Sequence, residues 1–115
     1  LIDRFSDSTI AYQHYGMGVD LNFIKEINNF LLKDINVDFT FLNTVNQKNM
    51  KNRLIKRKSL NRYDKFNTSF YEKVQSGFIK ILKKNPRKYL KINSNLSIDY
   101  NEKIILNKIN DLIRI

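Results

Sequence analysis

Apolar residues recur along most of this chain at spacings typical of amphipathic helices. Four helices are predicted in this way, over residues 21–32, about 47–58, about 69–84 and about 98–113, each with charged or amide side chains opposite its apolar positions. The residues expected to face inward are Leu21, Ile24, Ile27, Leu31 and Leu32; Met50, Leu54 and Ile55; Phe70, Val74, Phe78, Ile81 and Leu82; and Ile105, Ile109, Leu112 and Ile113.

Local signals mark the ends of these helices. Asp20 is placed to cap the first of them, and Ser69 and Glu72 have the spacing of a capping box at the start of the third. Asn85-Pro86 ends that third helix, since the residue before a proline disfavours helical geometry. The segment 14–18 contains two glycines and predicts a turn that needs positive φ.

Strands are predicted between the helices. Residues 37–45 are rich in β-branched and aromatic side chains, residues 89–93 alternate, and Leu1-Ile2 is interpreted as the end of a buried strand. Strands that alternate with helices favour a parallel sheet covered by helices, which is an α/β fold. The absence of repeats and of a Gly/Ser-rich linker favours a single domain.

Composition narrows the class of protein. A chain of 115 residues with 42% hydrophobic residues can form one packed core. It has no cysteine, which excludes disulfides and thiolate metal sites. No run reaches the roughly 18 apolar residues of a membrane span, and the start lacks the features of a signal peptide. We therefore expect no membrane partner and a cytoplasmic location.

The formal net charge of +10 raises the question of nucleic-acid binding. Most of the lysines are scattered, which is typical of solvated surface. The exception is a basic run that holds three of the six arginines, Arg53, Arg57 and Arg62, and leads into an irregular segment. A functional role is most plausible for this run.

The first residues of the chain carry the strongest chemical signal. Asp3 and Arg4 follow the predicted strand end, where ligands bind in parallel sheets, and Ser6, Ser8 and Thr9 supply hydroxyls at the start of a helix. An aspartate there can hold hydrated Mg²⁺, and an arginine can bind a phosphate through its planar fork. The plainer interpretation is a surface ion pair of little energetic value.

The longer pattern around this pair decides between the two interpretations. Asp3-Arg4-Phe5, followed by Ser8-Thr9-x-Ala11-Tyr12-Gln13, resembles the D-R-Y/F/H-x-x-S-x-x-A-Y-Q motif of bacterial thymidylate kinase. The resemblance extends through nearly the whole chain, up to the last helix. It implies the parallel, helix-flanked sheet of P-loop nucleoside monophosphate kinases. The chain contains no G-x-x-x-x-G-K-S/T sequence, so we expect residues 1–115 to be the C-terminal portion of one such domain, inactive alone.

The resemblance also implies roles for the opening motif, which spans residues 3–20. Arg4 would bind the dTMP phosphate and steady the transferred phosphoryl group, and Asp3 would act through a Mg²⁺-bound water. Thr9 and Gln13 would lie against the thymine, while Tyr12 would pack under the deoxyribose. Thr9, Tyr12 and Gln13 are spaced so that one helix face can present all three.

The basic run resembles the mobile lid of the same family, R-x-x-x-R-x-x-x-D-R-x-E, over about residues 53–66. Arg53, Arg57 and Arg62 stand at the motif arginines, while Asn61 stands where the motif has aspartate. The resemblance implies that this segment closes over ATP and places guanidinium groups on its phosphates, with Arg53 near the adenine.

The implied activity is transfer of the γ-phosphoryl group of MgATP to dTMP, which yields dTDP and ADP for dTTP synthesis, in a homodimer. A deoxynucleoside kinase of related fold is an alternative, but those enzymes usually carry Glu-Arg-Ser, and the Ala11-Tyr12-Gln13 continuation argues against it. A small basic nucleic-acid-binding module is another alternative. It needs aromatic residues between the basic ones, whereas Phe70 and Phe78 fall on a core stripe, so we expect no nucleic-acid partner. His14, the single histidine, is interpreted as a turn residue.

Overall fold

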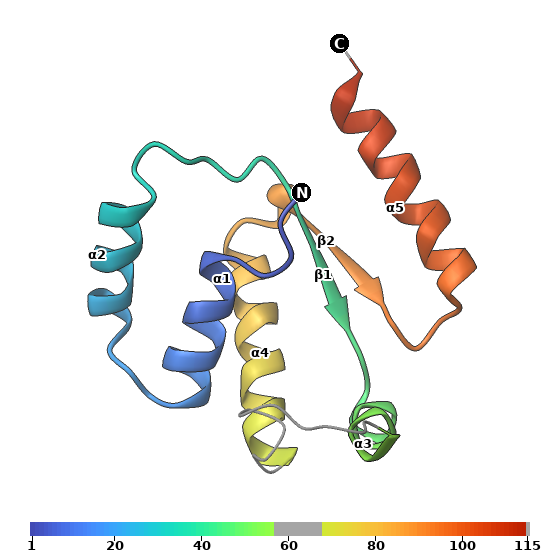
Figure 1. Ribbon diagram of the computed structural model, residues 1–115, viewed down its shortest axis with the longest axis horizontal. Helices are drawn as coiled ribbons and strands as arrows, with labels where there is room; N and C mark the ends of the chain where they lie inside the picture. Colours follow the sequence, from blue (N-terminus) through green and yellow to red (C-terminus); the bar gives the residue numbers. More distant parts are fainter. Residues whose placement is uncertain (57–67, 115) are drawn as a thin grey trace.

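The structure is a computed structural model that describes residues 1–56 and 68–114. Helices and strands alternate along them (Figure 1). In chain order the elements are α1 (Ser6–Thr9), the π-helix η1 (Ile10–Gly16), α2 (Leu21–Leu31), β1 (Thr40–Thr44), α3 (Gln47–Lys56), α4 (Thr68–Lys84), the 3₁₀ turn η2 (Pro86–Lys88), β2 (Tyr89–Asn93) and α5 (Ile98–Ile113). The α/β pattern predicted from the sequence is confirmed.

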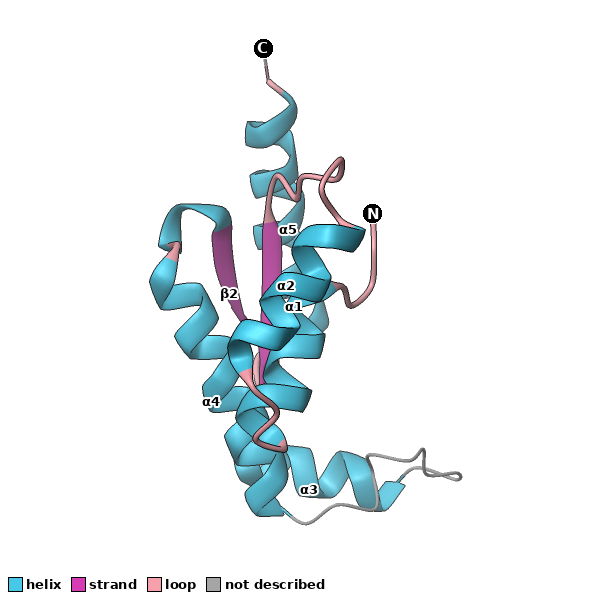
Figure 2. Ribbon diagram, turned by 90° about the vertical axis from the view of Figure 1, so that its left-hand side faces the viewer, coloured by secondary structure: helices cyan, strands magenta, loops and turns pink. Residues whose placement is uncertain are grey.

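The two strands form a parallel sheet between helices. Thr40 lies opposite Tyr89 at one end of the pair, and Thr44 lies opposite Asn93 at the other. In Figure 1, α1 and α4 lie to one side of the strands and α5 to the other, while α3 lies beyond the carboxyl ends (Figures 1 and 2). The parallel pairing and the flanking helices agree with the prediction.

The core lies where η1 packs on α4. Ala11 is completely buried, and Phe70 and Val74 are 8% and 3% exposed. The partly buried residues around them are Tyr12, Tyr71, Phe78 and Ile81. Four of the five residues in the apolar stripe predicted for the helix over 69–84 therefore belong to this core or pack against it, and Leu82 is the exception.

Glycines allow η1 and α4 to approach closely. A Cβ atom on Gly77 would lie 2.6 Å from the Cβ of Tyr15, and one on Gly16 would lie 2.7 Å from the ring of Phe70. Gly18 has a φ of +82°, which confirms the turn predicted after the first helix. Gly16, in contrast, is helical, so its lack of a side chain serves packing instead of turn geometry.

The strand predictions need correction at two places. Leu1 and Ile2 are exposed and lie in no strand. The strand predicted over 37–45 is shorter, Thr40–Thr44. A strand forms only where a neighbour satisfies its backbone groups. In the part of the chain that the structure describes, β1 and β2 pair only with each other, over five residues each.

The helix ends are predicted well, with one exception. Asp20 caps α2 by accepting a hydrogen bond from the backbone N–H of Phe23 at 3.0 Å, and α4 ends at Lys84, just before Asn85-Pro86. The predicted capping box is wrong. It requires Ser69 to precede the helix as its cap, but α4 begins at Thr68, so Ser69 lies within its first turn.

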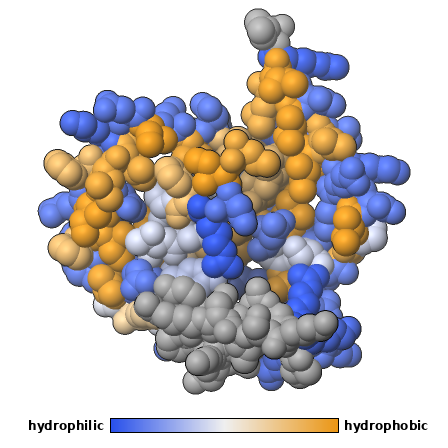
Figure 3. Space-filling view, viewed as in Figure 1, coloured by the Kyte–Doolittle hydropathy of each residue, from blue (hydrophilic) through white to orange (hydrophobic). Residues whose placement is uncertain are grey.

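Apolar side chains gather on the surface of α2 and α5 (Figure 3). Ile24 is buried, but Ile27 and Leu31 of the predicted inner face of α2 are exposed, as are Leu112 and Ile113 of α5. A two-stranded sheet offers too little apolar surface to cover the inner faces of all its helices. No helix among the described residues combines the length and the apolar character needed to cross a membrane.

A hydrogen bond between distant residues ties α1 to the sheet. The hydroxyl of Tyr89, at the start of β2, donates to Oδ2 of Asp7 in α1 at 2.5 Å. Burial of the phenol, and then its hydrogen bond to Asp7 and the charge of that carboxylate, raise the pKa of Tyr89 well above its usual value of 10.0. Tyr89 therefore stays protonated, and able to donate, throughout the neutral range.

Tyr89→Phe is expected to lower the free energy of unfolding by about 1–2 kcal/mol, because it leaves the part-buried Asp7 carboxylate without this donor. A tyrosine whose pKa is raised on folding stabilises the protein below its unfolded pKa and loses that contribution as pH rises through the folded pKa. The difference in the free energy of unfolding between the unmodified protein and Tyr89→Phe should therefore be constant from about pH 6 to 9 and shrink only at higher pH. Urea unfolding measures it, with the exposed Tyr100→Phe as control; equal losses in both variants would contradict the assignment.

Candidate functional site

The opening motif forms a shallow groove along the first helix. It has a volume of about 160 Å³ and is lined by Arg4, Ser8, Thr9, Tyr12 and Gln13. Of the dTMP-site residues predicted from the sequence, all four are in this lining. The groove thus combines a cation, two aliphatic hydroxyls, an amide and a phenol ring with its own hydroxyl, which can contact a phosphate, the edge of a base and a sugar.

Arg4 is held in an uncommon conformation at one end of the groove. Its φ of 60° is the single positive value among non-glycine residues in the described part of the chain. Its Nη1 donates a hydrogen bond to the hydroxyl of Tyr12 at 3.2 Å, and its guanidinium carbon lies 5.4 Å from the centre of the tyrosine ring. Non-glycine residues with this backbone geometry cluster at functional sites.

Tyr12 is supported from below by α4. Its ring centre lies 6.0 Å from that of Phe70, tilted by 57°, and 6.4 Å from that of Phe78, at 82°. Both are offset or edge-on arrangements that aromatic pairs favour. The helical backbone from Ile10 to Gly16 has π-type hydrogen bonding, a geometry frequent at functional sites.

The surroundings of Asp3 bear on the predicted magnesium site. Asp3 is exposed and adjoins Arg4. Residues 1–56 and 68–114 contain no group of three or more His, Cys, Asp or Glu side chains that could hold a metal ion. Mg²⁺ is usually bound by one or two carboxylates together with waters and substrate phosphates, so a single carboxylate beside an arginine, whose fork can bind phosphate, fits it.

Arg53, the arginine of the basic run that the structure describes, is not in the lining of this groove. Arg53, on α3, donates from Nη2 to the backbone carbonyl of Ser94, just after β2, at 2.7 Å. Asp7, beside the groove, is bonded instead to the first residue of β2. Arg53 and the helix that carries the groove are thus tied to opposite ends of that strand. Arg57 and Arg62 lie outside the described residues.

The interpretation of His14 as a turn residue needs correction, because His14 lies in the last turn of the π-helix η1 and contacts the turn that follows. Its Nδ1 lies 2.8 Å from the backbone carbonyl of Val19, across the turn that contains Gly18. Its ring packs edge-on against Tyr15 at 4.7 Å. These contacts stabilise the turn between η1 and α2.

An asparagine cluster that the sequence patterns did not reveal fixes α3. The side-chain oxygen of Asn95 accepts hydrogen bonds from the backbone N–H of Asn46 at 3.1 Å and from the amide of Asn49 at 2.8 Å. Asn46 in turn caps α3 by accepting from the backbone N–H of Asn49 at 2.8 Å. The cluster joins residues almost fifty positions apart, so no local signal could have identified it.

Asn95→Ala is expected to lower the free energy of unfolding by about 1 kcal/mol, because both donors at the start of α3 lose their acceptor. Asn95→Asp keeps an acceptor oxygen at the same place and should stay within about 0.5 kcal/mol of the unmodified protein. Urea unfolding of both variants shows whether the stability depends on the acceptor oxygen, which only Asn95→Ala removes, or on any substitution at this position. Equal destabilisation by both would show that the side-chain oxygen is not the stabilising group.

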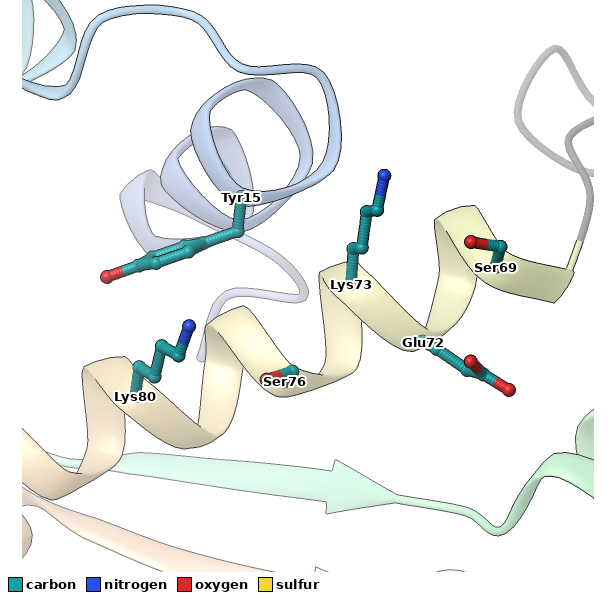
Figure 4. Close-up of a pocket in the computed structure, with 6 residues that line it drawn as sticks. All are labelled: Tyr15, Ser69, Glu72, Lys73, Ser76 and Lys80. Carbon is teal, nitrogen blue, oxygen red and sulfur yellow. The ribbon is translucent and has the colours of Figure 1, made fainter.

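A second groove, of about 340 Å³, runs along α4 below Tyr15 (Figure 4). Figure 4 shows Lys80 extending toward Tyr15, and its Nζ lies 5.3 Å from the ring centre. Glu72 and Lys73, also in its lining, carry opposite charges. None of the predicted site residues belongs to this groove, which has no concentration of one charge.

Comparisons with known proteins agree with the motif. The sequence model of the family described as thymidylate kinase matches residues 1–105. Thymidylate kinase from Staphylococcus epidermidis is 35% identical over 100 residues, which are 86% of this chain and 49% of that protein. Thymidylate kinase from Ehrlichia ruminantium is 39% identical over 105 residues, 89% of this chain and 48% of that protein.

The fold agrees as well. The crystal structure of thymidylate kinase from Ehrlichia chaffeensis superposes with a TM-score of 0.62 and 34% sequence identity, over 96% of this chain and 49% of that one. The chain thus spans about half the length of the relatives that it matches. The motif, the family match and the fold together show that the chain belongs to the thymidylate kinase family.

Proposed function

We propose that the protein is a thymidylate kinase, which transfers the γ-phosphoryl group of ATP to dTMP, and that this chain supplies the dTMP site. The observation that carries the proposal is the groove that gathers Arg4, Thr9, Tyr12 and Gln13. These are the residues to which the family motif gives contacts with dTMP. The family match supports this interpretation over a deoxynucleoside kinase or a nucleic-acid-binding module.

In this proposal the groove holds dTMP along its length. Arg4 binds the phosphate through its planar fork, which matches phosphate oxygens in geometry and charge. Thr9 and Gln13 contact the thymine, and the ring of Tyr12 lies against the deoxyribose. The two ends of the groove thus recognise the charged and the neutral parts of the nucleotide separately.

The reaction joins one oxygen of the dTMP phosphate to the γ-phosphorus of ATP and breaks the bond from that phosphorus to the bridging oxygen of ADP. Phosphoryl transfer depends on positioning and on stabilisation of charge, both of which Arg4 can supply to the acceptor phosphate. Asp3 is proposed to hold Mg²⁺ through a bound water, and Mg²⁺, when bound, neutralises charge on the phosphates.

We propose that the basic run binds ATP. In this arrangement Arg53 lies near the adenine, and Arg57 and Arg62 contact the phosphates. Arginine suits this role because it stays charged and donates several hydrogen bonds at once.

We further propose that the complete enzyme is a cytoplasmic homodimer that serves dTTP synthesis. Light scattering on the complete protein should give twice the mass of one chain.

The test is a coupled assay of ADP release by the complete natural protein, with dTMP, thymidine and dCMP as acceptors. The proposal predicts turnover with dTMP that greatly exceeds turnover with the other two. Preference for thymidine would move the protein to the nucleoside kinases. No turnover with any acceptor by a folded protein would reject kinase activity.

A further inference from the structure

We propose that Tyr12 is a positioning residue whose hydroxyl holds Arg4 ready for the phosphate of the nucleotide. This inference rests on the proposed function and deepens it. The family motif places the tyrosine ring against the sugar. The geometry points to an additional role for the hydroxyl, exerted through Arg4 on the phosphate end of the groove.

The contact between the two side chains leaves Arg4 available to a ligand. Nη1 of Arg4 donates to the Tyr12 hydroxyl at 3.2 Å, and the guanidinium carbon lies 5.4 Å from the ring centre. A guanidinium has five N–H donors in a planar fork, so a bond to one phenol oxygen leaves donors for phosphate oxygens. Arg4 and Tyr12 both line the groove, so the bond lies where the ligand is expected.

The backbone supports the same placement. The φ of 60° at Arg4 turns the chain between the first residues and α1, and this geometry costs free energy in any residue with a Cβ atom. From this turn, the side chain of Arg4 bonds to a residue eight positions later that also lines the groove. A strained residue at a ligand site is the pattern expected when orientation matters.

Tyr12 is a rigid support for this bond. Its ring contacts Phe70 and Phe78, which are both on α4, at centre distances of 6.0 and 6.4 Å. A long, exposed arginine otherwise loses rotamer freedom when it binds a ligand. The hydrogen bond to the packed Tyr12 already restricts the rotamers of Arg4 in the unliganded protein. Less conformational entropy is then lost when the ligand binds, so the affinity is higher.

This mechanism makes the effect of the hydroxyl specific to the phosphate. If the hydroxyl acts through Arg4, its removal weakens the binding of dTMP but not of thymidine, which has the same base and sugar but no phosphate. If it acts on the sugar or base, both ligands depend on it equally. The same logic requires that the hydroxyl lose its effect once Arg4 is removed.

The experiment is calorimetric titration of dTMP and of thymidine into the complete protein and into Tyr12→Phe, Arg4→Ala and the double variant. Phenylalanine keeps the ring and its packing on α4, so only the hydroxyl is removed. Tyr12→Phe is expected to weaken dTMP binding about three- to tenfold, as for the loss of one hydrogen bond, and to leave thymidine within twofold. In the Arg4→Ala background, Tyr12→Phe should have no further effect on dTMP.

Three results would overturn the inference alone. In each, Arg4→Ala weakens dTMP binding as the proposed function requires. In the first, Tyr12→Phe leaves dTMP binding unchanged; in the second, it weakens dTMP and thymidine binding equally; in the third, it still weakens dTMP binding in the Arg4→Ala background. If the unmodified protein binds neither ligand, the proposed function and this inference fail together. Thermal unfolding of Tyr12→Phe checks that the variant remains folded.

Discussion

Arg4→Ala in the complete protein is expected, from the proposed function, to lower kcat/KM for dTMP by about 100- to 1000-fold. Arg4 is the cationic side chain in the lining of the groove, so the acceptor phosphate would lose its charged, forked donor. Removal of one such electrostatic contact typically costs about 3–4 kcal/mol in the transition state, which corresponds to that range. The loss should appear in kcat as well as in KM if Arg4 also steadies the transferred group.

Two variants make the result specific. Arg87→Ala removes the same charge from an exposed position in η2, and it should leave both constants within about twofold because surface charges contribute little. Arg4→Lys keeps the charge but loses the planar fork, so its kcat/KM for dTMP should lie between those of Arg4→Ala and Arg87→Ala. Alanine retains a Cβ atom, so the backbone at φ 60° is not relieved as it would be by glycine. Unchanged kinetics in Arg4→Ala would mean that the groove does not bind the phosphate.

Sequence patterns predicted the features that depend on local spacing. The bounds of β2 and α5 match the alternating segment 89–93 and the helical periodicity over 98–113. Thr9, Tyr12 and Gln13 lie along one groove because residues three and four apart share a helix face. Such features require no knowledge of what the segment packs against.

Features that depend on distant partners were not predictable in the same way. Leu1-Ile2 has the composition of a strand but belongs to no sheet among the described residues. The distance between Arg53 and the groove depends on how α1 and α3 attach to opposite ends of β2. The contacts that decide this, at Tyr89 and at Asn95, join segments that are far apart in the chain.

Gly77→Ala is expected to have the largest effect on stability, with a loss of about 2–3 kcal/mol in the free energy of unfolding. The added Cβ would lie 2.6 Å from the Cβ of Tyr15, an atom next to the backbone that cannot rotate away. The two helices would have to separate. In an uncrowded helix interior the same change stabilises by about 1 kcal/mol, because glycine is a poor helix former, so even the sign of the effect is informative.

Ser76→Ala is the matched control for urea unfolding, since it places alanine one residue earlier, on the exposed face of α4, and should be neutral or slightly stabilising. Separation of η1 from α4 would also move Tyr12 relative to Phe70 and Phe78. We therefore expect Gly77→Ala to weaken dTMP binding even under conditions in which the variant is fully folded. A Gly77→Ala protein that is more stable than the unmodified one would show that η1 and α4 are not in close contact at this point.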